Sequence, residues 1–241
     1  MNKIAVITPV PDVIDTIVKN SIIRKAVEKD IIDFRIVHLR NYGIGNYKKI
    51  DDAPFGGGSG MVMMPGPLIR AVEDTILWMD KVKDIRIIYP SPQGVKWKQN
   101  LADEFSREQN IIIICGHYKG IDERVIKKYV TDEYSIGDFI MTSGEIPAMI
   151  ILDSIVRLIP GTLNNLESAL TDTFSSTLLD HPHYTQPRTV CEMNVPEILL
   201  GGNHEKIESW RKEKRKIRTK NRRPDIWEKY IQMKEMENKH E

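Results

Sequence analysis

YSIGDFIMTSGEIPAM, residues Tyr134–Met149, is the stretch that decides the fold. Its apolar run Phe139–Met141 is typical of a strand, and it ends in Thr142-Ser143-Gly144 directly before an apolar helical pattern. A tight turn of small residues leaves backbone N–H and C=O groups open to a ligand. The stretch therefore predicts a strand, a ligand-binding turn and a helix over 144–159.

Two segments upstream have the same form. The apolar run Ile111–Ile114 leads into Cys115–Gly120 (CGHYKG), and Ile85–Tyr89 leads into Pro90–Gly94 (PSPQG). Because the carboxyl ends of parallel strands meet at one edge of a sheet, three such loops predict one ligand pocket. We expect Cys115, at the end of an apolar run, to be a buried small hydrophobic residue and not a nucleophile.

The first part of the chain alternates strand and helix patterns, and this alternation predicts an α/β fold with a mainly parallel sheet. Further strands are predicted at Ile4–Thr8 and Asp33–Leu39, and helices at Val13–Lys29, Ile69–Lys81 and Lys96–Arg107. The polar, turn-rich Thr162–Pro187 predicts a linker. Short helices are predicted after it at Glu197–Leu200, Glu205–Lys216 and Pro224–Lys234. The expected organisation is a domain over 1–162, a linker over 163–175 and a small helical C-terminal domain over 176–241.

Composition places the chain among ordinary globular proteins. Of its 241 residues, 41% are hydrophobic and 29% are charged. Two cysteines, Cys115 and Cys191, cannot form a disulfide framework, and no apolar run approaches the ~20 residues that cross a bilayer. The start of the chain carries no signal-like apolar core, so we expect a cytoplasmic protein without a membrane partner.

The net charge is only +1, but the basic residues are unevenly distributed. Ten Lys or Arg residues lie between Lys206 and Arg223, against two glutamates. Such an excess suits phosphate backbones, and it equally suits the solvated face of a helix. Charge alone leaves both interpretations open.

Other motifs are ambiguous when taken singly. The glycine-rich Asp51–Met61 (DDAPFGGGSGM) lacks the P-loop and dinucleotide spacings, so it is either a flexible surface loop or a close approach to a ligand. His181-x-His183 with Cys191 fits no standard zinc spacing, and we expect no metal site. Arg157 in an apolar helix and Asp172 in the polar linker have ordinary structural explanations, a snorkelling or paired arginine and a capping aspartate.

Taken together, the motifs resemble one family. DDAPFGGGSGM, SPQG, CGHYKGIDER, SIGDF, SGEIPAM, DHPHYTQP and LLGGNH occur in this order between the first strand and about Trp227. In this order they closely resemble the bacterial tRNA (guanine-N1)-methyltransferases of the SPOUT superfamily. The resemblance implies transfer of a methyl group from S-adenosylmethionine to N1 of guanosine 37 of tRNA. It also implies a deep trefoil knot in the α/β domain and a homodimer whose tRNA site is shared, with tRNA and not DNA as partner.

The resemblance also assigns residues. Asp172 is the expected general base, and Arg157 is expected to stabilise charge on the guanine. Asp51, Gly57, Gly58 and Ser59 are expected to contact the substrate. The expected cofactor site comprises Tyr89, Pro90, Ser91, Pro92, Gly94, Gly116, Tyr118, Gly120, Ile136, Gly137, Asp138, Phe139, Ile140, Met141, Ser143 and Gly144.

One loop departs from the family. Where the commonest form is CGRYEG, this chain has His117 and Lys119. The family's dependence on magnesium makes Mg²⁺ a cofactor to consider, but Lys119 puts a carboxylate ligand at that position in doubt. Two alternatives stay open: a SPOUT-type methyltransferase acting on another RNA position, such as a ribose 2′-hydroxyl, and an RNA-binding protein without catalysis.

Overall fold

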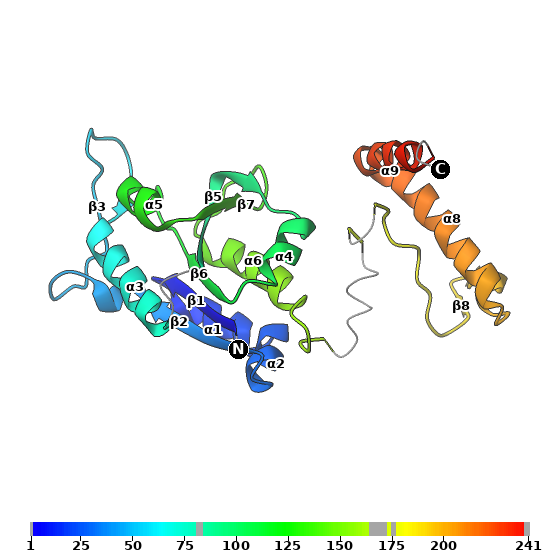
Figure 1. Ribbon diagram of the computed structural model, residues 1–241, viewed down its shortest axis with the longest axis horizontal. Coiled ribbons are helices and arrows are strands. Elements are labelled where there is room, and N and C mark those ends of the chain that lie inside the picture. The colour runs from blue at the N-terminus through cyan, green and yellow to red at the C-terminus, as the bar shows by residue number, and fades with distance from the viewer. Residues whose placement is uncertain (1, 81–83, 164–172, 175–176, 239–241) are drawn as a thin grey trace. The chain divides into compact units, whose positions relative to one another are not determined.

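The structure is a computed structural model that describes residues 2–80, 84–163, 173–174 and 177–238. The chain divides into two compact units, Met1–Leu166 and Glu167–Glu241. The larger unit contains a parallel sheet with helices on both faces, and the smaller unit is dominated by two helices (Figure 1).

The sheet of the larger unit has five strands in the order β2-β1-β6-β5-β7, and every neighbouring pair is parallel. The strands are β1 (Asn2–Thr8), β2 (Ile32–His38), β5 (Ile85–Lys96), β6 (Asn110–Ile114) and β7 (Asp132–Ser135). All five residues of β6 are buried, as a continuous apolar run predicts for a central strand covered on both sides. The predicted α/β fold with a mainly parallel sheet is confirmed.

Helices cover each face of this sheet (Figure 1). On one face, α1 (Pro11–Lys19), α2 (Ile22–Glu28), α4 (Gln99–Phe105) and α6 (Glu145–Val156) contribute to one hydrophobic core cluster. On the other face, α3 (Pro65–Trp78) and α5 (Glu123–Tyr129) contribute to a second. Between β2 and α3 lie the short helix η1 (Leu39–Tyr42) and the small hairpin β3 (Asp51–Asp52) and β4 (Val62–Met63).

Two sequence predictions were wrong. Val13–Lys29 is not one helix, because Ser21 begins α2 as its N-cap, its hydroxyl accepting from Ile23 N at 3.2 Å. Phe139–Met141 is not a strand. The chain leaves β7 at Ser135, Gly137 adopts φ 151°, and Ile140 is 80% exposed with no ladder partner. The apolar run is therefore a surface loop that only resembles a strand in composition.

The smaller unit contains a short hairpin followed by helices. The hairpin is β8 (Thr189–Val190) and β9 (Met193–Asn194), and the helices are η2 (Glu197–Leu199), α8 (His204–Arg222) and α9 (Pro224–Glu237). Asn203 caps α8 through its side-chain oxygen, which accepts from Lys206 N at 3.0 Å. No helix within the described part of the chain is both long and apolar enough to span a membrane.

Candidate active site

A pocket of about 670 Å³ opens at the bulge in β5 and at the carboxyl ends of β6 and β7, where the three predicted loops meet. This volume falls in the range of small-molecule sites. The loop after Tyr89 bulges out of the β5–β7 ladder, which shifts register between Pro90 and Val95. The loops after β6 and β7 supply the remaining walls. The fold thus gathers at one edge the loops that the sequence predicted to lie together.

Most of the predicted cofactor residues line this pocket. Fourteen of the sixteen do so, and the exceptions are Gly94 and Asp138. A Cβ at Gly94 would lie 2.4 Å from the backbone of Glu133, so this glycine serves close strand packing. Asp138 turns to Lys96, with its carboxylate 2.5 Å from Nζ. Four further lining residues belong to the predicted loops, namely Gln93, His117, Lys119 and Thr142. Sequence reasoning missed the other lining residues, which are Ile121, Glu123, Ile126, Glu133, Tyr134, Ser135 and Pro147.

Two glycines let the loops approach one another at the pocket floor. Gly144 N donates to Gly116 O at 2.8 Å, and a Cβ on Gly144 would lie 2.7 Å from Gly116 N. A Cβ on Gly116 would lie 2.8 Å from the ring of Tyr89, which is 6% exposed. Burial raises the pKa of the Tyr89 hydroxyl, which therefore stays protonated. The small residues of the turn are required by the close approach of the two loops.

Next to these loops lies a buried carboxylate that no sequence motif predicted. Glu145 is 1% exposed, and its carboxylate is 2.8 and 2.9 Å from His117 Nε2. Thr8, at the end of β1, donates its hydroxyl to Glu145 at 2.5 Å. Burial alone would raise the pKa of Glu145, but hydrogen bonds from His117, Thr8 and Ser143 outweigh burial, and the pKa is lowered. An ionised Glu145 therefore joins β1, the β6 loop and α6.

The carboxylate of Glu145 also affects the pKa of the Cys115 thiol. Burial, and then the nearby charge of Glu145, raises the pKa of the Cys115 thiol well above its ordinary value. The thiol is fully buried and stays protonated. The prediction that Cys115 is a buried hydrophobic residue is confirmed.

The glycine-rich loop after β3 is tied to the pocket through its base. Met63 N donates to Gly120 O at 3.0 Å, and Lys119 N donates to Met61 O at 3.1 Å. The stem of Lys119 also packs over Gly60, 3.2 Å from where a Cβ would stand. The tip residues Gly57 and Gly58 have open space around them and positive φ. Asp51 pairs with Met63 in the hairpin, which places this loop beside one rim of the pocket.

The two predicted catalytic residues are not brought together by the described part of the chain. Asp172 lies outside the described residues. Arg157 is the C-cap of α6, whereas the pocket lies at the N-terminal end of this helix. The thirteen helical steps from Gly144 to Arg157 span roughly 20 Å at about 1.5 Å each. Within one chain, Arg157 is therefore remote from the pocket.

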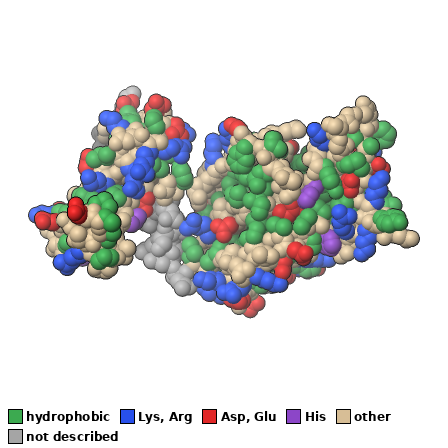
Figure 2. All heavy atoms as spheres, turned by 180° about the vertical axis from the view of Figure 1, so that it is seen from behind, with side chains coloured by type: hydrophobic (Ala, Val, Ile, Leu, Met, Phe, Trp, Pro, Cys, Tyr) green, Lys and Arg blue, Asp and Glu red, His purple; other side chains and the backbone are tan. Residues whose placement is uncertain are grey.

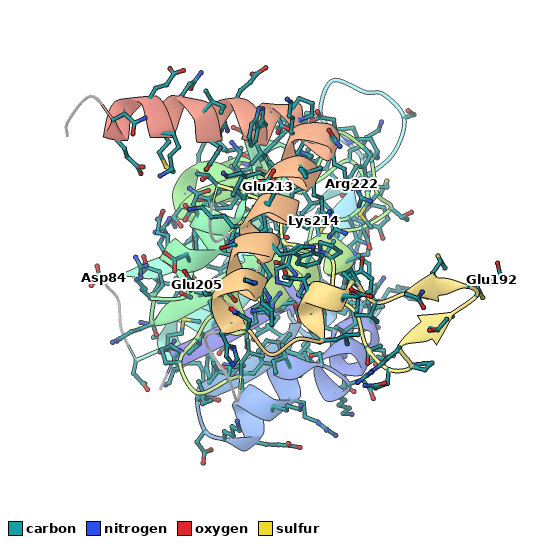
Figure 3. All side chains as sticks on the ribbon, turned by 90° about the vertical axis from the view of Figure 1, so that its right-hand side faces the viewer. Asp84, Glu192, Glu205, Glu213, Lys214 and Arg222 are labelled. Atoms are coloured by element: carbon teal, nitrogen blue, oxygen red, sulfur yellow. The ribbon has the colours of Figure 1, made fainter. Side chains whose placement is uncertain are left out.

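Basic side chains gather over the smaller unit, as the blue surface in Figure 2 shows. Glu205, Glu213, Lys214 and Arg222 follow one another along α8 (Figure 3). Part of this basic set has structural partners, since Arg218 donates to Asp180 O at 3.3 Å. Other members, including Lys220 and Arg222, are exposed. The basic residues of α8 thus include both side chains that hydrogen-bond within the smaller unit and side chains that are exposed to solvent.

Comparison with known proteins identifies the family. The chain matches the family model "tRNA (Guanine-1)-methyltransferase TrmD" over residues 2–229. It is 45% identical over 234 residues to a tRNA (guanine-N(1)-)-methyltransferase of Brevibacillus brevis, covering 97% of this chain and 95% of that protein. A protein of the same name from Staphylococcus carnosus is 46% identical, covering 95% of this chain and 91% of that protein. The resemblance indicated by the ordered motifs is confirmed, and the chain belongs to the tRNA (Guanine-1)-methyltransferase TrmD family.

Proposed function

We propose that this protein transfers a methyl group from S-adenosylmethionine to N1 of guanosine 37 in tRNA, giving 1-methylguanosine. One observation carries the proposal. In a chain of this family, the three predicted loops converge on one pocket of small-molecule size. The curated relatives carry the name of tRNA (guanine-N(1)-)-methyltransferases.

The pocket residues fit a nucleoside cofactor. Tyr89, Ile136 and Phe139 offer apolar surface for a base, and Gly116 and Gly144 line the pocket without a Cβ. When bound, S-adenosylmethionine supplies an electrophilic methyl group on its sulfonium. The protein must hold this methyl in line with the target nitrogen and exclude water from the reacting atoms.

A magnesium ion is less well supported by the donor set. The carboxylates Glu123 and Glu133 line the pocket. Among the described residues, however, the cluster of three His, Cys, Asp or Glu side chains able to share an ion lies elsewhere, at residues 180–183. The basic side chain of Lys119 also lines the pocket that contains Glu123 and Glu133. We therefore derive no step through Mg²⁺.

Catalysis requires a base and a positive charge, and we assign them to Asp172 and Arg157. N1 of guanine is a poor nucleophile until its proton is removed, and a carboxylate within hydrogen-bond reach accepts that proton. A guanidinium near O6 offsets the negative charge that develops there. Asp51, Gly57, Gly58 and Ser59, beside one rim of the pocket, contact the target base or its neighbours.

We further propose that two copies of the chain complete the site. Arg157 lies at the opposite end of α6 from the pocket of the same chain. In a complete site, the pocket of one subunit would therefore be combined with Arg157 of the other subunit. Ile146 and Ile150, four residues apart on α6, are 40% and 47% exposed, and Ile140 is 80% exposed. These apolar side chains form a face that a homodimer would bury.

The remaining assignments follow the same proposal. The α/β domain over 1–162 is knotted where the loops after β6 and β7 cross, residues 163–175 link the domains, and 176–241 bind tRNA through the exposed cations of α8. The crossing is supported by the hydrogen bond from Gly144 N to Gly116 O and by the bridge between His117 and Ser143. A tRNA substrate is consistent with a cytoplasmic protein.

The test compares two transcripts of one tRNA, with guanosine or adenosine at position 37, incubated with the purified chain and methyl-labelled S-adenosylmethionine. We expect label only in the guanosine transcript. Equal labelling of both would favour the alternative, a SPOUT-type methyltransferase acting at another position. Binding of both transcripts without labelling would favour an RNA-binding protein without catalysis.

A further inference from the structure

The smaller unit carries a cluster of potential metal ligands that the methyl-transfer site does not use. Asp180, His181 and His183 each offer one ligand atom, and these three atoms lie within 4.8 Å of one another. His183 Nε2 is 2.7 Å from Asp180 Oδ2, and His181 Nε2 is 3.8 Å from Asp180 Oδ1. Both imidazoles therefore direct the same nitrogen at one carboxylate.

The surroundings of His181 leave its Nε2 available as a metal ligand. Its Nδ1 lies 3.1 Å from Pro182 O, and a carbonyl oxygen can only accept a hydrogen bond. In the tautomer that donates from Nδ1 to this carbonyl, the lone pair of Nε2 is directed at the carboxylate of Asp180, 3.8 Å away. A metal-binding histidine shows this same pattern, in which the second ring nitrogen donates to a carbonyl.

The segment is held in place by its surroundings. Leu179 N donates to Thr219 Oγ1 at 2.9 Å, and Arg218 on α8 donates to Asp180 O at 3.3 Å. His181 N donates to Asp180 Oδ1 at 2.7 Å, which fixes the rotamer of the carboxylate. The His181 side chain is 14% exposed, and the ring of Trp210 lies 6.3 Å from it. Asp180 and His181 are therefore preorganised, and the more exposed His183 completes the set.

We propose that Asp180, His181 and His183 form a binding site for a borderline divalent transition metal, with Zn²⁺ as the representative ion. Two imidazoles and one carboxylate suit such ions, whereas Mg²⁺ prefers an all-oxygen set. With bonds of about 2.0–2.2 Å, tetrahedral ligands stand about 3.4 Å apart. The two distances to Asp180 reach this value through changes of less than ~1 Å. Three protein ligands leave the fourth position open to water or to a phosphate oxygen.

Proton balance sets one requirement. In the metal-free state, Nε2 of His183 donates to Asp180. On binding, this nitrogen must give up its proton, either to solvent or by moving the proton to Nδ1 of the same ring, so that its lone pair can bind the ion. Affinity should therefore fall as pH drops and protons compete for the imidazoles.

The test titrates the chelator-treated full chain with Co²⁺ and Zn²⁺, following the visible absorption of Co²⁺ and the heat of Zn²⁺ binding. We expect one ion per chain, with affinity reduced at least ~10-fold in His181→Ala and in His183→Ala. His204→Ala, at an exposed histidine of α8 outside the cluster, is the matched control and should bind as the wild type does. Equal affinity in His181→Ala and the wild type, or no stoichiometric binding by the wild type, would overturn the proposal.

A second measurement needs no variant in the cluster. Long-range ¹H–¹⁵N NMR of the wild-type chain reports which nitrogen of His181 carries the proton. We expect the proton on Nδ1, and a shift of the Nε2 resonance when Zn²⁺ is added. A proton on Nε2, or a resonance that zinc leaves unmoved, would contradict the site even if the alanine variants failed to fold.

Discussion

Replacing His117 by alanine should destabilise the larger unit, because it removes a partner from a buried charge. Glu145 is 1% exposed, and its carboxylate lies 2.8 Å from His117 Nε2. Removing one partner of a buried ion pair costs about 3–5 kcal/mol, and a hydrogen bond to a charged group contributes about 1.5–3 kcal/mol. Since Thr8 and Ser143 still donate to the carboxylate, we expect a loss of about 2–4 kcal/mol in the free energy of unfolding.

The pH dependence of this loss follows from the sign of the shift. The folded-state pKa of Glu145 is lowered, so its stabilisation is complete above the unfolded value of about 4.3 and disappears as pH falls through the folded pKa. Without His117 the folded pKa rises, so the difference from the wild type should shrink in acid.

Urea unfolding at pH 7 and at a series of pH values falling below about 4, followed by near-ultraviolet circular dichroism, measures both effects. The exposed His204→Ala serves as control and should change stability by less than about 0.5 kcal/mol. A loss below about 0.5 kcal/mol for His117→Ala at pH 7, or a loss that stays the same throughout the acid series, would refute the reasoning.

Three other perturbations test separate parts of the account. Gly144→Ala places a Cβ 2.7 Å from Gly116 N, so the two loops can no longer approach as closely. We expect this variant to lose S-adenosylmethionine binding, as measured by calorimetry. Wild-type affinity in this variant would show that the close approach of the loops is not needed. Arg86→Met removes the two hydrogen bonds, of 2.8 and 2.6 Å, to Asp132 and should cost about 2–3 kcal/mol in urea unfolding at pH 7. Hydrogen bonds from Arg86 and Thr131 outweigh burial and lower the pKa of Asp132, so this cost should fall in acid, and a cost that grows in acid would contradict the assignment. Replacing Lys220 and Arg222 by alanine should weaken tRNA binding and lessen its salt dependence, whereas neutralising exposed cations of α2 should do neither; an unchanged salt slope would argue against phosphate contacts.

Much of the larger unit could be predicted because its signals are local. The run Ile111–Ile114 is buried on both faces of the sheet, and such runs identify central parallel strands. Pro147 lies in the first turn of α6, where a missing N–H costs little, so the start of this helix was also readable. Loops following these strands had to meet at one edge, which located the pocket.

The errors arose where composition and tertiary context disagree. Phe139–Met141 has the residues of a strand but lines a pocket as an exposed loop, because Gly137 turns the chain away from the sheet. The burial of Glu145 could not be predicted from the sequence, since a glutamate at the start of a helix is ordinarily exposed. Its burial depends on His117 and Thr8, which are 28 and 137 residues away in sequence. Contacts of this kind cannot be deduced from periodicity.

The proximity of Asp180, His181 and His183 was not predicted, for a related reason. Spacing rules directed attention to Cys191, which is exposed in the β8–β9 turn, and overlooked Asp180. The carboxylate becomes a partner because the histidine rings fold back toward it, with their centroids 4.3 Å apart. Proximity of this sort is set by backbone dihedrals and not by residue spacing.

The central claim is that this chain methylates N1 of guanosine 37, and the most direct measurement identifies the methylated atom. A tRNA bearing guanosine 37 is incubated with the chain and S-adenosylmethionine, digested to nucleosides and analysed by mass spectrometry against standards, in parallel with the Asp172→Ala variant. We predict 1-methylguanosine from the wild-type chain and almost none from Asp172→Ala, although that variant still binds the cofactor. A 2′-O-methylated nucleoside, or wild-type turnover by Asp172→Ala, would contradict it.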